Sequence, residues 1–560
     1  MTLPVVIGAS ARRSREDSRE AGMLYGINTL GAVAGTVAAS FLLVPQIGLL
    51  RTCLVAGALD AAVALLAWLL DRDVGVIESS PGADSRAART AAPSSTRAGG
   101  PSPHQWAVLG LFAISGAIAI GFEVAWFRIL GLTFGPSVYA FAAMLAIYLL
   151  GVGAGSALAG PWVQRTRLSG LGLFASLEAA LAAVGLAALL LVNALPSLYV
   201  SVFRGLLGPL HEGALAGSQL AVAGALVFLP CLIMGMIFPA AVRAFREAGR
   251  DGSPESNVGR LYVWNTIGGI AGSLVTGFVL LPRFGVWSTM TGAAVGSLLV
   301  ASGVAGVAIA RAGSFLRVRR DLIGMVPGVL AVLTVVWFIP RWNIADFNRG
   351  RYRFLYSATS DQEKLDPGQL IYHREGVNVS VAVYRGLGAA SLHIGGKPDA
   401  STNLSDILTQ CLSGHLPLMF APRIEKVGVV GYGSGMTAGA ALTHPEVREL
   451  DLMEIEEAVI DASVYFDCIS DDPLDDPRTH LLVEDGRVHL TYAPDKYDVL
   501  ISEPSNPWMA GITNLFTREF TTRSCGTISN PTASLRSGSR TTISPRRSAR
   551  SWRRCTTRFP

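Results

Sequence analysis

The chain has 560 residues, of which half are hydrophobic and only 16% are charged, so it is too apolar to be an ordinary soluble protein of its size. The formal net charge is +5, but residues 521–560 hold nine arginines and no acid, and subtracting them leaves −4, which gives no case for a nucleic-acid partner. The six cysteines are scattered, with no CxxC pair and no histidines at ligand spacing, so we expect neither a metal site nor a disulfide framework.

Long apolar runs recur through the first 340 positions and are absent afterwards. A helix needs about 20 apolar residues to cross a hydrocarbon core of ~30 Å, and these runs reach that length. The sequence therefore predicts a multi-pass protein of the cell membrane, with the lipid bilayer as a partner. Nine spans are expected near residues 23–45, 49–70, 106–127, 137–160, 168–193, 215–241, 261–282, 285–310 and 321–340.

An internal repeat lies in this apolar part. LYGINTLGAVAGTVAASFLLVPQIGLLRT at 24–52 matches LYVWNTIGGIAGSLVTGFVLLPRFGVWST at 261–289. The pairs in register are Tyr25/Tyr262, Asn28/Asn265, Gly31/Gly268, Gly35/Gly272, Pro45/Pro282 and Gly48/Gly285. Four predicted spans, within 106–241, directly precede the second copy, whereas only residues 1–23 precede the first, so we expect the first repeat to be incomplete. Restoring four spans would give two six-helix units, an arrangement that resembles a major-facilitator-type transporter.

Small residues recur at helical spacing in both copies, as Gly31 with Gly35 and as Gly268 with Gly272. Glycines four residues apart lie on one face of a helix and let another backbone approach closely in lipid, where van der Waals packing replaces the hydrophobic effect. We interpret these glycines as helix-packing positions rather than as ligand contacts.

Three acids fall within predicted spans, namely Asp60, Glu123 and Glu178. An ionised carboxylate in hydrocarbon is costly unless it faces a cavity or a partner. These acids could therefore line a path for protons or cationic amines. In the alternative interpretation, Glu123 pairs with Arg128 near a membrane surface and the other two lie close to span ends.

Past Pro340 the pattern becomes that of an α/β domain, with alternating strands followed by a helical stretch at 404–419. A buried strand at 427–431 then leads into a glycine turn and a helix. The turn consists of Gly431, Tyr432, Gly433, Ser434 and Gly435. Its missing side chains let the backbone close on a ligand at the start of the helix.

Acids follow the turn at the spacing of a nucleoside-binding α/β domain. Glu454 ends the second strand about 20 residues on, where a carboxylate can accept both ribose hydroxyls. Asp485 and Gly486 follow a third strand, and the fourth strand, within 497–508, ends in a polar turn. Open α/β sheets bind ligands at the carboxyl edge, so we expect the active site there.

Residues 370–520 resemble spermidine synthases, and more closely the membrane-fused synthase-like proteins. The motifs that carry the resemblance are GKPDAS (396–401), GHLPLM (414–419), GYGSG (431–435), MEIEEAVI (453–460), EDGR (484–487) and SEPSNPWMAGITNLFTREF (502–520). The resemblance implies that Glu454 holds the ribose, Asp485 with Gly486 contacts the adenine, and the glycine turn contacts the thioether region. It also implies that Glu503 draws a proton from the attacking amine and that Gln410 contacts the nucleoside substrate.

Two departures from the family pattern concern cation-binding acids. Ser434 stands where the family has the Asp that holds the cationic aminopropyl end, and Asn506, a candidate substrate-binding residue, replaces a second Asp. Decarboxylated S-adenosylmethionine or ordinary S-adenosylmethionine therefore both remain as the expected co-substrate, with no prosthetic group. The expected partners are an amine and a nucleoside, and a homodimer through the synthase domain is left open.

The leading hypothesis is a membrane-bound spermidine synthase-like enzyme that transfers an aminopropyl or related alkyl group to an amine. Two alternatives stay open: a transporter or sensor with a degenerate domain that binds a nucleoside or polyamine without catalysis, and an S-adenosylmethionine-dependent methyltransferase. In a further alternative, Glu503 merely caps a turn. Arginine counts favour a C-terminal domain outside the cell, whereas a nucleoside-sulfonium substrate is normally cytoplasmic, so the side of the membrane is not assigned.

The residues after Phe520 change character abruptly, with 25 Arg, Ser or Thr among 40 and no periodicity. We expect none of the closing strands that a Rossmann-like sheet needs there. A frameshifted reading frame and a natural basic disordered tail are the two explanations.

The expected fold class is an α-helical multi-span membrane domain followed by an α/β Rossmann-like domain of the S-adenosylmethionine-dependent methyltransferase type, which a small β region precedes. Residues 72–104 have the composition of a flexible loop. The expected segments are a partial first transmembrane repeat (1–71), this loop (72–104), a second repeat (105–311), a final span (312–341), a small β and helical part (342–425), the Rossmann-like domain (426–520) and an aberrant disordered tail (521–560).

Overall fold

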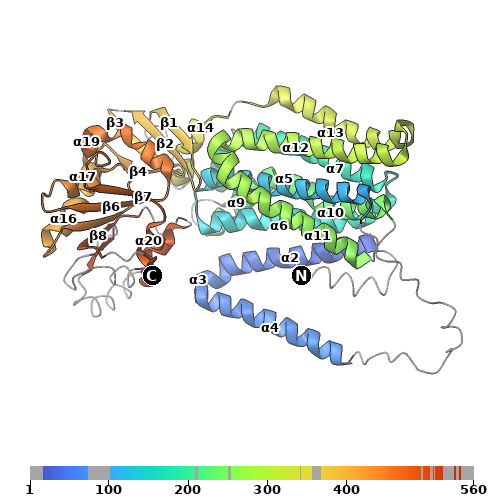
Figure 1. Cartoon of the computed structure of the whole chain (residues 1–560), viewed down its shortest axis with the longest axis horizontal. Helices are drawn as coiled ribbons and strands as arrows, with labels where there is room; N and C mark the ends of the chain where they lie inside the picture. The colour runs from blue at the N-terminus through green and yellow to red at the C-terminus, as the bar shows by residue number, and fades with distance from the viewer. Residues whose placement is uncertain are drawn as a thin grey trace.

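The computed structural model describes residues 17–73, 101–207, 212–249, 254–340, 342–355, 368–386, 388–492, 496–504, 509, 511–520, 535–537 and 541–543. A bundle of long helices and an α/β region lie side by side in it (Figure 1). Most of the expected 72–104 loop and most of the 521–560 tail lie outside the described residues.

The helical region occupies the first part of the chain. Its elements are α2 (Asp17–Val37), η1 (Ala38–Leu43), α3 (Val44–Ile47), α4 (Leu49–Asp73), α5 (Pro103–Phe134), α6 (Val138–Arg165), α7 (Gly170–Val192), α8 (Leu195–Leu207), α9 (Glu212–Ala223), η2 (Gly224–Phe228), α10 (Leu229–Ala248), α11 (Pro254–Val275), η3 (Thr276–Leu280), α12 (Leu281–Ala312), η4 (Phe315–Val318) and α13 (Arg319–Phe338). Serine side chains cap the starts of α5, α6 and α7, which fixes where these helices begin.

Eight helices in the described part are long and apolar enough to cross a membrane, by length and composition. The sequence predicted nine because it separated 261–282 from 285–310. The structure joins these two into one run from Ser256 to Ala312, with a break in the helical backbone at Gly285, where φ is 74°. The predicted boundary therefore lies at a sharp bend and not at a loop.

The two copies of the repeat share unusual backbone features. In each, a π-helical segment lies just before a proline: η1 precedes Pro45, and η3 precedes Pro282. Proline has no N–H to donate and its ring clashes with the carbonyl four residues earlier, which favours a widened turn at that point. Three residues later, Gly48 and Gly285 adopt φ of 80° and 74°. The repeat seen in the sequence is thus also a repeat of conformation.

The copies differ in how their small residues are used. A Cβ on Gly268 would overlap the carbonyl oxygen of Ala113, and one on Gly272 would overlap that of Ala117, so α11 and α5 pack closely there. Built Cβ atoms on Gly31 and Gly35 meet nothing within 4 Å. The packing role expected for these glycines holds in the second copy, while the corresponding face of α2 is open.

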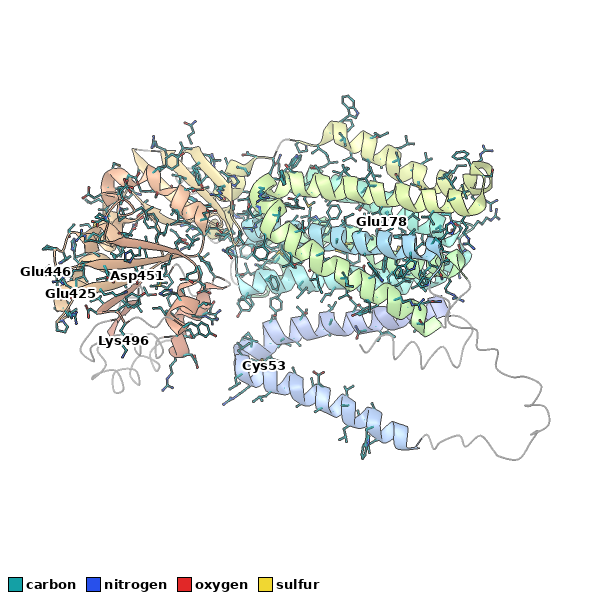
Figure 2. The ribbon with its side chains drawn as sticks, in the orientation of Figure 1. Cys53, Glu178, Glu425, Glu446, Asp451 and Lys496 are labelled. Carbon is teal, nitrogen blue, oxygen red and sulfur yellow. The ribbon has the colours of Figure 1, made fainter. Side chains whose placement is uncertain are left out.

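The acids of the predicted spans have different surroundings. Glu178 on α7 is fully buried inside the bundle (Figure 2) and accepts a hydrogen bond from the Ser115 hydroxyl on α5, so it does not lie at a span end. Asp60 on α4 is exposed. Arg128 reaches the α/β region, where it donates to the Val377 carbonyl oxygen at 2.9 Å, and does not depend on Glu123 for a partner.

The α/β region contains two sheets. After α14 (Ile344–Asn348) and η5 (Arg351–Phe354), an antiparallel sheet of order β1-β2-β3-β4 forms the expected small β region. Its strands are β1 (Gln369–Glu375), β2 (Ser380–Gly386), β3 (Ala389–Ile394) and β4 (Lys397–Ser401), and α16 (Leu404–Phe420) follows. In Figure 1, β1, β2 and α14 lie at the side of this region nearest the bundle.

The second sheet has the order β10-β9-β8-β5-β6-β7. Its central strands run parallel, with buried apolar side chains such as Val427, Leu452 and Ile501, as expected for strands covered on both faces. The strands are β5 (Lys426–Val430), β6 (Glu449–Glu454), β7 (Thr479–Val483), β8 (Val499–Ser502), β9 (Leu535–Ser537) and β10 (Thr541–Ile543). The short elements between them are α17 (Met436–Leu442), α18 (Glu457–Asp461), η6 (Ser463–Tyr465), α19 (Asp467–Ser470) and α20 (Gly486–Tyr492), and η7 (Ile512–Phe516) follows β8.

The expectation that no strand follows Phe520 is wrong, because two three-residue strands, β9 and β10, lie beyond it. β9 pairs in parallel with β8, and β10 pairs antiparallel with β9, so both extend the sheet beyond β8. Backbone hydrogen bonds alone define such short strands, and their pairing with a distant strand leaves no periodic signal in the sequence.

Candidate functional site

The glycine turn lies where β5 ends and α17 begins. Gly431, Gly433 and Gly435 have φ of 92°, 59° and 79°, a left-handed conformation that side chains with a Cβ rarely adopt. The turn is closed by a hydrogen bond from Gly435 N to Tyr432 O at 2.9 Å. The glycines predicted from the spacing are therefore required by the local backbone.

Glu454 lies at the carboxyl end of β6 and faces this turn. Its Oε2 accepts a hydrogen bond from Tyr432 N at 2.9 Å, and its Oε1 accepts one from Glu456 N at 2.9 Å. Burial raises the pKa of the Glu454 carboxyl, and hydrogen bonds from the backbone N–H groups of Tyr432, Glu456 and Ile455 oppose that rise. The carboxyl group is thus held in one place beside the turn.

A polar cluster lies on the other side of the turn. The Ser434 hydroxyl donates to Gln410 Oε1 at 2.6 Å, which joins the turn to α16. The Thr437 hydroxyl lies 3.2 Å from Gln410 O and 3.4 Å from Glu503 Oε2. The structure therefore brings together three residues predicted from the motifs, Gln410, Ser434 and Glu503, from three different elements.

Asp485 follows β7, the strand next to β6, and is partly exposed. Its Oδ1 accepts a hydrogen bond from Arg487 N at 2.8 Å, so the carboxylate caps the start of α20. A Cβ on the neighbouring Gly486 would lie 2.9 Å from Val430 Cγ1 and 3.5 Å from Met453 Cβ. The Asp485-Gly486 pair thus lies against the ends of the two strands that lead to the glycine turn and to Glu454.

One predicted residue cannot be placed, and two contributors were not predicted. Asn506 lies outside the described residues. Thr437 bridges Gln410 and Glu503, and Glu456 donates its N–H to Glu454, yet neither was singled out. Glu456 stands within the MEIEEAVI motif next to Glu457. The motif alone does not show which of the two acids contacts Glu454, because that depends on the folded structure.

The arrangement fits a ligand with hydroxyl groups and a reacting amine. Each carboxylate oxygen of Glu454 has a second lone pair beyond the backbone bond that it accepts, so both oxygens can accept ligand hydroxyls. Glu503 is a partly exposed carboxylate at the same sheet edge and can accept a proton.

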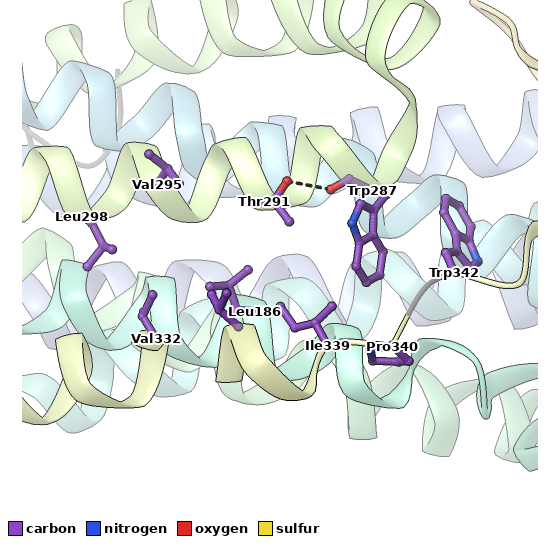
Figure 3. A pocket seen from close by; sticks show the side chains of 10 residues that line it. Leu186, Trp287, Thr291, Val295, Leu298, Val332, Ile339, Pro340 and Trp342 are labelled. Carbon is purple, nitrogen blue, oxygen red and sulfur yellow. Dashed lines mark hydrogen bonds between the residues drawn. The ribbon is translucent and has the colours of Figure 1, made fainter. Parts of the chain in front are cut away.

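A cavity with a volume of about 560 Å³ lies elsewhere, in the helical region. Leu186, Trp287, Thr291 and Val332 are among its lining residues, which come from α7, α12 and α13 together with the segment that follows α13 (Figure 3). The Thr291 hydroxyl is occupied by a hydrogen bond to the carbonyl oxygen of Trp287 in its own helix. This apolar cavity contains none of the predicted site residues.

Part of the α/β region is similar to known proteins. Residues 408–529 match the family model for the spermine/spermidine synthase domain. A polyamine aminopropyltransferase from Bacillus subtilis is 37% identical over 106 residues, which cover 19% of this chain and 38% of that protein. One from Clostridium perfringens is 34% identical over 106 residues, which cover 19% of this chain and 37% of that protein. The chain thus spans less than two fifths of the length of these curated relatives.

Among solved structures, the spermidine synthase from Thermotoga maritima has a TM-score of 0.27 and 20% identity to this chain, over 30% of this chain and 56% of that one. The segment that matches the family model carries Gln410, the glycine turn, Glu454, Asp485 and Glu503. The α/β region of this chain is therefore similar to polyamine aminopropyltransferases over the segment that carries the candidate site.

Proposed function

We propose that this chain is a membrane-bound, spermidine synthase-like transferase that moves an aminopropyl or related alkyl group from an S-adenosylmethionine-type donor to an amine. The observation that carries the proposal is the position of Glu454, whose carboxyl group is bonded to the Tyr432 N–H of the glycine turn. A carboxylate fixed beside such a turn suits a ribose whose attached group extends over the turn. Similarity to polyamine aminopropyltransferases supports the same reaction class.

In the proposed reaction, the amine nitrogen attacks the carbon next to the donor sulfonium. A C–N bond forms, the C–S bond breaks, and its electron pair stays on sulfur, so methylthioadenosine leaves when the donor is decarboxylated S-adenosylmethionine. Glu503 takes the proton that the amine must lose, and the rest of the task is to hold the two reactants in line.

The identity of the donor is part of the proposal. The Ser434 hydroxyl donates a hydrogen bond to Gln410. Because position 434 of the turn is a serine, it offers no carboxylate to a cationic aminopropyl group. Decarboxylated S-adenosylmethionine is the leading donor, and ordinary S-adenosylmethionine with methyl transfer is the competing one.

We also propose that the helical region spans a bilayer. The eight long apolar helices among the described residues support this, as do the large apolar side chains that the region exposes, such as Leu50, Leu59, Leu333 and Trp337. Such faces are unfavourable in water and favourable in lipid. Alkaline carbonate extraction of membranes from cells that express the full chain tests this, because an embedded protein stays in the pellet.

The reaction is tested with the full chain in detergent, given decarboxylated S-adenosylmethionine and putrescine. Release of methylthioadenosine supports aminopropyl transfer, and release of S-adenosylhomocysteine from S-adenosylmethionine would support methyl transfer. Binding of methylthioadenosine without either product supports the second candidate, a transporter or sensor whose α/β region binds a nucleoside without catalysis. The hydrogen bond from the Ser434 hydroxyl to Gln410 favours that candidate, because it engages the polar side chain of the turn that would otherwise be available to a substrate.

A further inference from the structure

One arginine of the helical bundle reaches into the α/β region. Arg128 on α5 donates from Nη2 to the carbonyl oxygens of Gly376 at 3.1 Å and Val377 at 2.9 Å. Its Nε lies 4.0 Å from Glu375 Oε2, and the two side chains are only 12% and 4% exposed. A planar guanidinium that bonds two carbonyls beside a buried carboxylate fixes the position of the segment that carries them.

This segment, residues 376–379, joins β1 to β2, and Glu456 holds it from the opposite side. Glu456 Oε2 accepts hydrogen bonds from Asn378 N at 2.9 Å and Val379 N at 3.4 Å. A Cβ on Gly376 would overlap the Glu456 carboxylate, so the glycine permits this close approach. The 376–379 turn therefore lies between a bundle arginine and an acid of the α/β region.

Glu456 in turn contacts the candidate nucleoside site. Its backbone N donates to Glu454 Oε1 at 2.9 Å, while Tyr432 N of the glycine turn donates to Glu454 Oε2 at 2.9 Å. Glu456 is 4% exposed and Glu454 is 8% exposed, so water competes little for these bonds. A continuous series of hydrogen bonds thus runs from α5 through the 376–379 turn and Glu456 to Glu454.

A second contact joins the bundle to the α/β region. Ser137, which caps α6, forms an antiparallel β-bridge with Met509, a residue of the motif that follows Glu503. Met509 is 3% exposed. The bundle therefore contacts the α/β region at two places, the 376–379 turn through α5 and Met509 through the start of α6.

We propose that Arg128 and Glu456 are positioning residues that couple the helical bundle to Glu454, so that the arrangement of α5 sets the affinity of the nucleoside site. The proposal rests on the proposed function in one respect, since it takes Glu454 as the carboxylate that binds the nucleoside. Coupling between two sites is reciprocal, so nucleoside binding also favours one arrangement of α5.

The test uses the full chain in lipid nanodiscs and two measurements. The first is amide hydrogen exchange without ligand in the peptides that contain residues 376–379 and Tyr432. The second is the dissociation constant of methylthioadenosine. For Arg128→Ala we expect faster exchange in both peptides and affinity at least about fivefold weaker, the low end of typical coupling between sites.

Arg478→Ala is the matched control. Arg478 also donates to backbone carbonyls, Leu442 O at 2.7 Å, Val447 O at 3.1 Å and His444 O at 3.4 Å, but it lies at the amino end of β7, away from this series of contacts. It should change neither the affinity nor exchange at Tyr432. Glu456→Gln is a second variant, which keeps the side-chain shape while replacing one acceptor oxygen with a donor. It should show the same faster exchange and weaker affinity as Arg128→Ala, so the proposal stays testable if Arg128→Ala folds poorly.

The outcomes separate the two proposals. Faster exchange confined to residues 376–379, or methylthioadenosine affinity within twofold of the unmodified chain in both variants, would overturn the coupling. If the unmodified chain does not bind methylthioadenosine while faster exchange still spreads to Tyr432, the coupling holds and the nucleoside function fails.

Discussion

Each region of the molecule buries a carboxylate, and the two are held in different ways. Glu178 in the bundle is held by side chains: it accepts from the Ser115 hydroxyl, and the Ser297 hydroxyl also acts on it. Glu454 in the α/β region accepts from backbone N–H groups, among them those of Tyr432 and Glu456. Backbone donors cannot rotate away, so Glu454 is fixed for a ligand, whereas Glu178 has a freer geometry. The rigidly held carboxylate is the one expected to bind a ligand in the proposed function.

The largest predicted effect concerns Glu503. Glu503→Gln should lower kcat for methylthioadenosine release by about 10²- to 10⁴-fold, because general-base help contributes on this scale. The dissociation constant of methylthioadenosine should change little, since in the proposed reaction Glu503 acts on the amine rather than on the nucleoside. Single-turnover kinetics and a binding titration measure the two quantities, and unchanged kcat would show that Glu503 only shapes the turn.

The next effect concerns Glu454 and its pH dependence. Burial raises the pKa of this carboxyl, and the charged form accepts ligand hydroxyls best. Methylthioadenosine affinity should therefore weaken as pH falls through this raised pKa, at a higher pH than for an ordinary glutamate. Glu454→Gln should bind roughly 10- to 100-fold more weakly, the cost of a hydrogen bond to a charged group, and its affinity should not vary over this range. If the methylthioadenosine affinity of Glu454→Gln still varied with pH, the titrating group would be a residue other than Glu454.

A matched pair of glycine substitutions tests how closely the helices pack in the two copies of the repeat. Gly268→Ala places a Cβ against the carbonyl of Ala113, and overpacking of this kind costs about 1–3 kcal/mol. Gly31→Ala, at the corresponding position of the first copy, meets open space and should cost less than about 0.5 kcal/mol. Thermal unfolding in detergent compares them, and equal destabilisation would contradict the difference in packing between the two copies.

The smallest effect concerns Thr437. Thr437→Val removes the hydroxyl between Gln410 and Glu503 at nearly the same volume. One net hydrogen bond corresponds to roughly a 2- to 10-fold change, and we expect a fall of that size in kcat with methylthioadenosine affinity retained. A weaker affinity with unchanged kcat would place Thr437 in the nucleoside site instead.

Local patterns made part of the site predictable. The spacing of strand, glycine turn, helix and acid fixes Gly431, Gly435 and Glu454 relative to one another, because neighbouring parallel strands end at one edge. Thr437 and Glu456 could not be singled out, because their roles depend on contacts with α16 and with the 376–379 turn. Arg128 acts on residues 248 and 249 positions away, a separation that one sequence does not reveal.

The fold was predictable where periodicity is strong. Apolar runs located the long helices, and the repeat seen in the sequence coincides with the bends that the structure has at Gly48 and Gly285. The short strands β9 and β10 were missed because three-residue strands carry no pattern and depend on pairing with β8. The sequence also gave no sign that Gly31 and Gly268 would differ in packing, since their surrounding motifs are alike.

The most direct test of the account is an experimental structure of the full chain with methylthioadenosine. The account predicts that both ribose hydroxyls lie within hydrogen-bond distance of the Glu454 carboxylate, with the adenine next to Asp485 and the thioether over the glycine turn. A nucleoside bound in the apolar cavity between α7, α12 and α13, or with its ribose away from Glu454, would contradict it.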